Sequence, residues 1–191
     1  MEKFLLKDTI ESDSILLRKH RMSDAGKIFE SIDKDRARLT KFLPWPPAIK
    51  TVQDEANYID YTHKAWEQHR LFDYSIFYNP GEVFVGSVGV LNLNWPNAAA
   101  ELGYWIVGEY EGKGLVSRAV GALAAYLFEA GFFRLEVRCT EGNFRSCQVA
   151  ERLGFSREGV LRGNIIENGA RRNTIVYSKL ATDPRGLISC T

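Results

Sequence analysis

The sequence predicts a single domain of the α+β (mixed α/β) class, with a mostly antiparallel central sheet flanked by helices. Early in the chain, apolar residues alternate with period two in segments separated by turn sequences. Later, segments with helical spacing alternate with short strands. The 191 residues suit one continuous core, and no repeat or linker divides them. Residues 182–191 show no period and are expected to fray.

The N-terminal half is expected to hold a short strand at 14–18, two helices and three further strands. The first helix starts at Ser23-Asp24 and continues through Leu39, and three prolines exclude regular helix from 42–47. Thr51 and Asp54 form a capping box, which predicts a second helix to about residue 68. Alternation then predicts a hairpin with strands 72–78 and 83–91, and a third strand at 100–107.

The C-terminal half is expected to alternate between helix and strand. A helix follows Gly114 and closes at Gly131, which is expected to be its C-terminal glycine cap because it follows the last apolar residue of the helical pattern. A strand at 133–139, a short helix at 143–153 that ends at Gly154, and strands at 155–160 and 172–180 complete the domain. Asn168-Gly169 supplies a turn between the last two strands.

The composition excludes several classes of function. Lys plus Arg is 25 and Asp plus Glu is 24, so no net charge attracts nucleic acid or an anionic membrane. The three cysteines and three histidines lack the spacing of metal ligands, so no metal site is expected. The first apolar run is broken by charge, unlike a signal peptide, and no run approaches the ~18 apolar residues of a membrane helix. We expect a cytoplasmic protein.

The segment EYEGKGLVSRA, residues 109–119, places two glycines just before a helix. Free N–H groups and the positive end of the helix dipole bind anions there, and glycine lets the backbone approach a phosphate closely. A plain strand-to-helix turn is the alternative. The spacing excludes a Walker loop, and Ser117 stands where the Rossmann fingerprint has its third glycine.

Four motifs occur in a fixed order: Glu101-Leu-Gly-Tyr-Trp105, Gly112-Lys-Gly114, Asn143-Phe-Arg-Ser146 and Glu151-Arg-Leu-Gly-Phe155. This set resembles the GNAT superfamily of acetyl-CoA-dependent N-acetyltransferases. Its closest likeness is to the ribosomal-protein N-terminal acetyltransferases of the RimJ/RimL type, over roughly residues 15–180. The resemblance implies a sheet that splays apart at a wedge for the cofactor.

The resemblance also implies a set of contacts to acetyl-CoA. The pantetheine arm would lie along the strand 104–107, beside a splay from strand 135–139, and the pyrophosphate would sit on the N–H groups of the glycine loop. The implied residues are Trp105, Ile106, Val107, Gly112, Lys113, Gly114, Leu115, Val116, Ser117 and Asn143. Asn143 either hydrogen-bonds the pantetheine or caps its helix. Glu109 stands where the family has Gln or Arg, and it either faces the pyrophosphate or turns away.

Ser146 and Glu101 are the catalytic candidates. Many GNAT enzymes place a tyrosine where this chain has Ala150, and the closest branch has a serine at Ser146 to protonate or hydrogen-bond the CoA sulfur. The alternative is an ordinary serine of the first helical turn. Glu101 lies in an apolar strand, where it activates the amine through water or pairs with an arginine such as Arg134 or Arg138.

The other polar candidates are expected to be structural. Glu167 lies near where related enzymes carry an acid, with Ile165 as the other residue for that place, and an exposed turn position is favoured for it. Cys147 is expected to be a small buried side chain. Trp45 either forms an exposed platform for the substrate or packs at the edge of the core, and packing is favoured. His63 and His69 are expected to face solvent.

The predicted reaction is direct acetyl transfer to a primary amine in a ternary complex, without an acyl-enzyme. An α-amine, with a pKa near 7.7–8.0, is far more often neutral than a lysine near 10.4, which favours an α-amine as the acceptor. The resemblance implies the N-terminus of a ribosomal or other protein. A small amine, an antibiotic or an aminoacyl compound is the alternative acceptor. A non-catalytic acyl-CoA-binding protein is the alternative of another class. Direct nucleic-acid or membrane contact is not expected, and a homodimer is compatible with the exposed aromatic strands.

Overall fold

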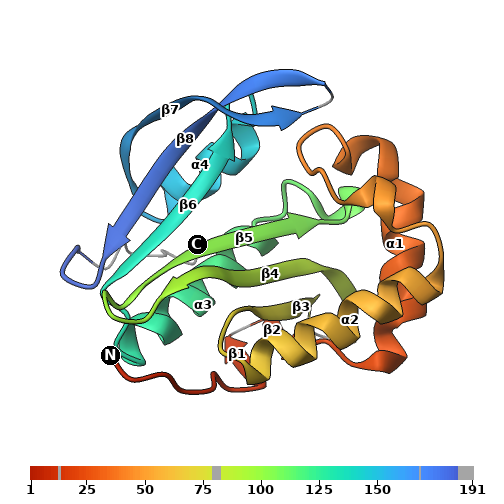
Figure 1. Cartoon of the computed structure of the whole chain (residues 1–191), viewed down its shortest axis with the longest axis horizontal. Coiled ribbons are helices and arrows are strands. Elements are labelled where there is room, and N and C mark those ends of the chain that lie inside the picture. The colour runs from red at the N-terminus through yellow and green to blue at the C-terminus, as the bar shows by residue number, and fades with distance from the viewer. Residues whose placement is uncertain (13, 79–82, 168, 185–191) are drawn as a thin grey trace.

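The computed structural model describes residues 1–12, 14–78, 83–167 and 169–184. One eight-stranded sheet has the order β1-β2-β3-β4-β5-β6-β8-β7 (Figure 1). All neighbouring strands are antiparallel except β5 and β6, which run parallel. The strands are β1 Thr9–Ser12, β2 Ile15–Lys19, β3 Phe72–Tyr78, β4 Val83–Asn94, β5 Ala99–Ile106, β6 Arg134–Thr140, β7 Ser156–Glu167 and β8 Ala170–Leu180.

In the part of the chain that the structure describes, four α-helices cover the two faces of the sheet. The helices α1 (Ala25–Leu39) and α2 (Val52–Glu67) lie over one face, and α3 (Leu115–Glu129) and α4 (Phe144–Arg152) lie over the other (Figure 1). Short 3-10 turns connect them to neighbouring segments; these are η1 Met22–Asp24, η2 Pro46–Ala48 and η3 Gly108–Tyr110. None of the described helices has the length and apolarity that crossing a bilayer requires.

Local sequence determines where the helices begin and end. Thr51 accepts a hydrogen bond from the Asp54 N–H, and the Asp54 carboxylate accepts one from the Thr51 N–H, which confirms the predicted capping box. The Asn143 side chain caps α4 by accepting from the N–H of Ser146 at 3.2 Å. Gly131 follows α3 at φ +102, a conformation that glycine adopts without strain.

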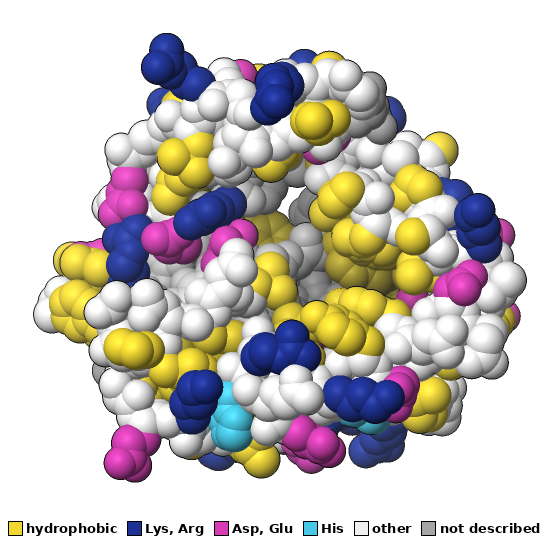
Figure 2. Space-filling model, viewed as in Figure 1, with side chains coloured by type: hydrophobic (Ala, Val, Ile, Leu, Met, Phe, Trp, Pro, Cys, Tyr) yellow, Lys and Arg dark blue, Asp and Glu magenta, His cyan; other side chains and the backbone are white. Residues whose placement is uncertain are grey.

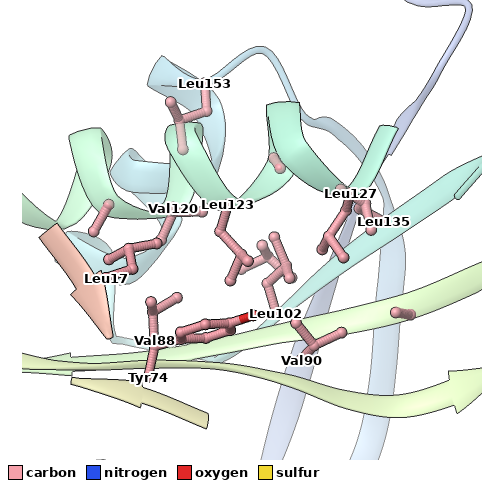
Figure 3. Close-up of a cluster of buried hydrophobic side chains, with 14 of the residues drawn as sticks. Leu17, Tyr74, Val88, Val90, Leu102, Val120, Leu123, Leu127, Leu135 and Leu153 are labelled. Carbon is pink, nitrogen blue, oxygen red and sulfur yellow. The ribbon is translucent and has the colours of Figure 1, made fainter. Parts of the chain in front are cut away.

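Two apolar clusters hold the helices to the sheet. The larger lies between α3 and the strands, where Val120, Leu123 and Leu127 of the helix meet Tyr74 and Leu102 of the sheet (Figure 3). The smaller lies on the opposite face and joins α1, α2, β3 and β4. Ala100, Leu102, Tyr104 and Ile106 of β5 contact the larger cluster, and Trp105, whose side chain points to the other face of the strand, contacts the smaller one.

All four predicted helices are confirmed, and the strands differ in number and length. Strand β1 was not predicted, because its four residues carry a single buried apolar side chain, Ile10. The last two strands are longer than predicted, since the β7–β8 ladder continues past irregularities near Gly159 and Gly163. The predicted turn at 79–82, Asn168 and residues 185–191 lie outside the described residues.

Candidate active site

The strands β5 and β6 pair along their first halves and then diverge. Their parallel pairing runs from Ala99 opposite Arg134 to Leu102 opposite Val137, although β5 continues to Ile106 and β6 to Thr140. The molecule is hollowed where the two strands diverge, on the face that carries α1 and α2 (Figure 2). The divergence lies between the two strands for which the family resemblance implied a splay.

The open edge of β5 exposes backbone groups of alternate residues. Val107 donates its N–H to the carbonyl of Val85 in β4 at 2.8 Å. Because strand backbone groups alternate in direction, those of Trp105 also face β4, while those of Tyr104 and Ile106 face the splay. The Val107 carbonyl accepts from the N–H of Tyr110 at 3.0 Å. Both backbone groups of Val107 are therefore engaged within the protein, so a contact of Val107 with the pantetheine arm would not be a backbone hydrogen bond of the kind that extends a sheet.

The glycine loop follows β5 and leads into α3. Gly112 and Gly114 have φ values of +74 and +71, in the left-handed region that favours glycine. A Cβ added at either residue would meet no atom within 4 Å, so the space beside both is open. The first bond of the helix ladder runs from the Arg118 N–H to the Gly114 carbonyl. The N–H groups of residues 115–117 precede that ladder and are left for an external acceptor.

The side chains of the loop are mostly committed to the protein. Leu115 is buried in the larger core, and the Ser117 hydroxyl accepts a hydrogen bond from Arg152 at 3.0 Å. The Lys113 ammonium lies 5.0 Å from the centre of the Tyr110 ring. Val116 also packs against the core. An anion at this place would therefore meet backbone N–H groups, with Lys113 as the nearby charge.

An ion network from α1 fixes the segment between β5 and α3. Arg38 donates to the Ile106 carbonyl and, at 2.6 Å, to the Glu111 carboxylate, while Asp35 accepts from the Gly108 N–H at 2.7 Å. Burial alone would raise the pKa of Asp35, but the hydrogen bonds from Arg38 and Gly108 hold it below its ordinary value. The partners are 68 to 73 residues apart, which is why no sequence pattern revealed this network.

Two acids beside the loop have different partners. Glu109 is half exposed and turns toward α1, where it lies 3.4 Å from the Lys34 ammonium. Hydrogen bonds from Tyr110 and Lys34 lower its pKa. Glu111 pairs with Arg38 and also with Arg145 of α4, so it connects the ends of the two diverging strands. The open question about Glu109 is answered in favour of an orientation toward α1.

Ser146 lies in the first turn of α4, between the two diverging strands. Its hydroxyl is 3.0 Å from the Tyr104 hydroxyl of β5, and it accepts from the Cys139 thiol of β6 at 3.2 Å. Tyr104 also donates to the Ser146 carbonyl at 3.0 Å. The cap by Asn143 fixes the backbone of the same turn, so the predicted capping role of Asn143 is confirmed.

Glu101 lies in the part of β5 that is still paired. Its carboxylate accepts from Asn92 at 2.9 Å and lies 3.4 Å from Arg138, one of the two arginines that the sequence suggested. Arg134 instead pairs with Glu136 and Glu158. The structure thus supplies the ion pair, and a catalytic role for Glu101 stays a prediction.

Glu167 is buried rather than exposed, contrary to the favoured expectation. Its carboxylate accepts from the Thr140 hydroxyl at 3.3 Å, and the residue is only 9% exposed. The reason is that β7 extends to Glu167, opposite Ala170, and so keeps the side chain on the sheet beside the end of β6. Cys139 faces α4, so Thr140, the next residue, faces the opposite side with Glu167.

The remaining candidates are structural in their contacts. The Trp105 ring lies 5.7 Å from Trp45 and 5.8 Å from Phe84, which confirms that Trp45 packs. Cys147 is buried, as predicted. His63 and His69 are half-buried rather than facing solvent, and His63 hydrogen-bonds the carbonyl of His20 at 2.7 Å. Within the described ranges, no three His, Cys, Asp or Glu side chains are grouped to hold a metal ion.

Known proteins share both the sequence and the fold. A family model described as an acetyltransferase (GNAT) domain matches residues 14–156. The Bacillus subtilis (strain 168) protein YdaF, provisionally named a ribosomal N-acetyltransferase, is 30% identical over 185 residues, 92% of this chain and 96% of YdaF. The ribosomal-protein-serine acetyltransferase of Escherichia coli (strain K12) is 25% identical over 170 residues, 88% of this chain and 94% of that protein.

One similar solved structure contains acetyl-CoA. The microcin C7 self immunity acetyltransferase MccE, in complex with acetyl-CoA and AMP, superposes with a TM-score of 0.85 at 26% identity, covering 88% of this chain and 93% of MccE. The similarity to YdaF and to the Escherichia coli enzyme confirms the resemblance to the ribosomal-protein N-acetyltransferases. The chain belongs to the GNAT family of acetyltransferases and uses acetyl-CoA as the co-substrate of an N-acetyl transfer.

Proposed function

We propose that this enzyme acetylates the N-terminal α-amine of a protein, in a ternary complex without an acyl-enzyme. The observation that carries the proposal is that two acids beside the splay, Glu101 and Glu111, are neutralised by arginines. Glu101 pairs with Arg138, Glu111 with Arg38 and Arg145. A polyamine has several positive charges and requires free carboxylates, whereas a single α-amine requires only one base.

The relatives support the same class of acceptor. YdaF and the Escherichia coli enzyme are both named for ribosomal acetylation, and this chain covers more than nine-tenths of each. An α-amine with a pKa near 7.7–8.0 is also substantially neutral at pH 7.5, so it needs less help from a base than lysine does. A protein N-terminus fits both arguments.

The chain's own residues divide the work between the two sides of the splay. The N–H groups of residues 115–117 and the open glycines would hold the pyrophosphate, and the Tyr104 backbone and the Ile106 N–H would hold the pantetheine arm, since the Ile106 carbonyl already accepts from Arg38. Ser146 would donate a hydrogen bond to the departing thiolate. Glu167, on the face away from α4, would take the proton of the amine directly or through water, and Glu101, which is paired with Arg138, is the alternative base.

The test compares acceptors by the release of free CoA thiol. We expect turnover with a peptide that has a free N-terminus and little with spermidine or with the same peptide Nα-blocked and carrying an internal lysine. Ser146→Ala should slow the preferred reaction while acetyl-CoA affinity is kept. A preference for spermidine or for the lysine would refute the proposal, and a preference for an aminoacyl nucleotide would favour the small-molecule alternative.

A further inference from the structure

Ser146 is held at the point where β5 and β6 separate. The last paired residues on the α3 and α4 side of the sheet are Leu102 and Val137. Had the ladder continued, Tyr104 and Cys139 would be the next pair on this side, because side chains alternate with period two. Instead, the Ser146 hydroxyl sits between them, 3.0 Å from the Tyr104 oxygen and 3.2 Å from the Cys139 sulfur.

The hydroxyl of Ser146 has one donor and two acceptor sites. Cys139 donates into one acceptor site. Tyr104 lies 3.0 Å from both the carbonyl and the hydroxyl oxygen of Ser146, so its single O–H can turn to either. When Tyr104 donates to the hydroxyl, both acceptor sites of Ser146 are filled and its own O–H is free to point elsewhere. When Tyr104 donates to the carbonyl, Ser146 can donate back to Tyr104.

Both partners are donors throughout the neutral range. Burial raises the pKa of the Cys139 thiol to about 12 and also raises the pKa of Tyr104, so each keeps its proton. Exchange between the two hydrogen-bond arrangements requires only the rotation of two O–H bonds. No heavy atom has to move, so the change is fast compared with turnover.

We propose that Tyr104 is a positioning residue that turns the O–H of Ser146 toward the departing thiolate of CoA. The inference rests on the proposed role of Ser146. The new C–N bond forms as the C–S bond breaks, the sulfur keeps the electron pair of that bond, and the amine proton leaves to the base. Ser146 donates a hydrogen bond to the thiolate and keeps its proton, since an alcohol is a weaker acid than a thiol.

The experiment is a double-mutant cycle between Tyr104→Phe and Ser146→Ala on the full chain. Tyr104→Phe should lower kcat about tenfold, with the KM and Kd of acetyl-CoA unchanged. The Tyr104 hydroxyl orients the O–H of Ser146, and that O–H acts only on the leaving group. The double variant should be no slower than Ser146→Ala alone. The matched control is Tyr74→Phe. The buried hydroxyl of Tyr74 donates to the Lys7 carbonyl at 2.9 Å, and the kcat of this variant should equal the wild-type value.

Cys139 provides a second test that leaves Tyr104 in place. Cys139→Ala removes the other donor to Ser146 and should lower kcat several-fold, whereas Cys139→Ser keeps a donor and should restore it. Full activity of a folded Tyr104→Phe, or losses that multiply in the double variant, would overturn the inference. So would equal rates for Cys139→Ala and the wild type if Tyr104→Phe does not fold.

The outcomes also separate this inference from the proposed function. A slow Ser146→Ala beside a fully active Tyr104→Phe refutes the positioning role and leaves the role of Ser146 intact. A fully active Ser146→Ala refutes both. The cycle depends on thiol release, so it can be measured with whichever amine the enzyme accepts.

Discussion

Replacing Gly114 with leucine tests whether the glycine loop binds the pyrophosphate or is only a turn between β5 and α3. An added Cβ meets no protein atom within 4 Å, so the side chain fits without a clash. The backbone, at φ +71, would be strained, at a cost of about 1–2 kcal/mol in the free energy of unfolding. Gly169 is the matched control, because its φ is +76 and its surroundings are equally open.

The effect on acetyl-CoA should be larger than the effect on stability. The side chain would occupy the space that a pyrophosphate needs beside the N–H groups of α3. Each hydrogen bond to a charged group contributes about 1.5–3 kcal/mol. Losing one or two of them would cost about 3 kcal/mol, which raises the Kd of acetyl-CoA about 100-fold.

The assay pairs urea unfolding with calorimetric titration of acetyl-CoA. Gly114→Leu and Gly169→Leu should lose similar stability, and only Gly114→Leu should lose affinity. If both variants bind acetyl-CoA like the wild type, the glycines serve a turn alone and the cradle is refuted.

Two further predictions concern buried charge. Burial raises the pKa of Glu55 from its ordinary 4.5 to about 7, so the neutral form favours folding and stability is lost as pH rises through about 7. Glu55→Gln should therefore stabilise the protein by up to about 3 kcal/mol at pH 8.5 and by little at pH 4.5, and a difference without pH dependence in urea unfolding would contradict this. Arg38→Met removes the donors to Ile106 and Glu111 and should cost about 2 kcal/mol and weaken acetyl-CoA binding. Lys34→Met, which removes only the exposed pair with Glu109, should do neither, and a thermal melt with and without acetyl-CoA measures both.

Local features of the sequence predicted most of the fold. The capping box at Thr51 and the glycines that end α3 and α4 act within a few residues, so their signals can be read directly. Strand β1 and the full length of β7 depend on pairing with distant strands, and their own residues do not show it. Burial of Glu167 follows from that pairing, which explains the wrong expectation for it.

The candidate site was predictable to the extent that it consists of backbone and motif. The glycine loop and Ser146 lie where the sequence placed them, because a helix start and a strand end define both. The contact of Tyr104 with Ser146 joins residues 42 apart, and the Arg38 bond to Ile106 joins residues 68 apart. Such contacts arise only when β5, α4 and α1 are brought together by the fold.

The most direct test of the central claim locates the acetyl group on a protein acceptor. The enzyme is incubated with isotopically labelled acetyl-CoA and a mixture of unacetylated ribosomal proteins, and the products are mapped by mass spectrometry. The account predicts label on an N-terminal α-amine, released thiol in equal amount, and slower formation of both with Ser146→Ala. Label confined to lysine side chains, or unlabelled proteins beside a rapidly acetylated small amine, would contradict it.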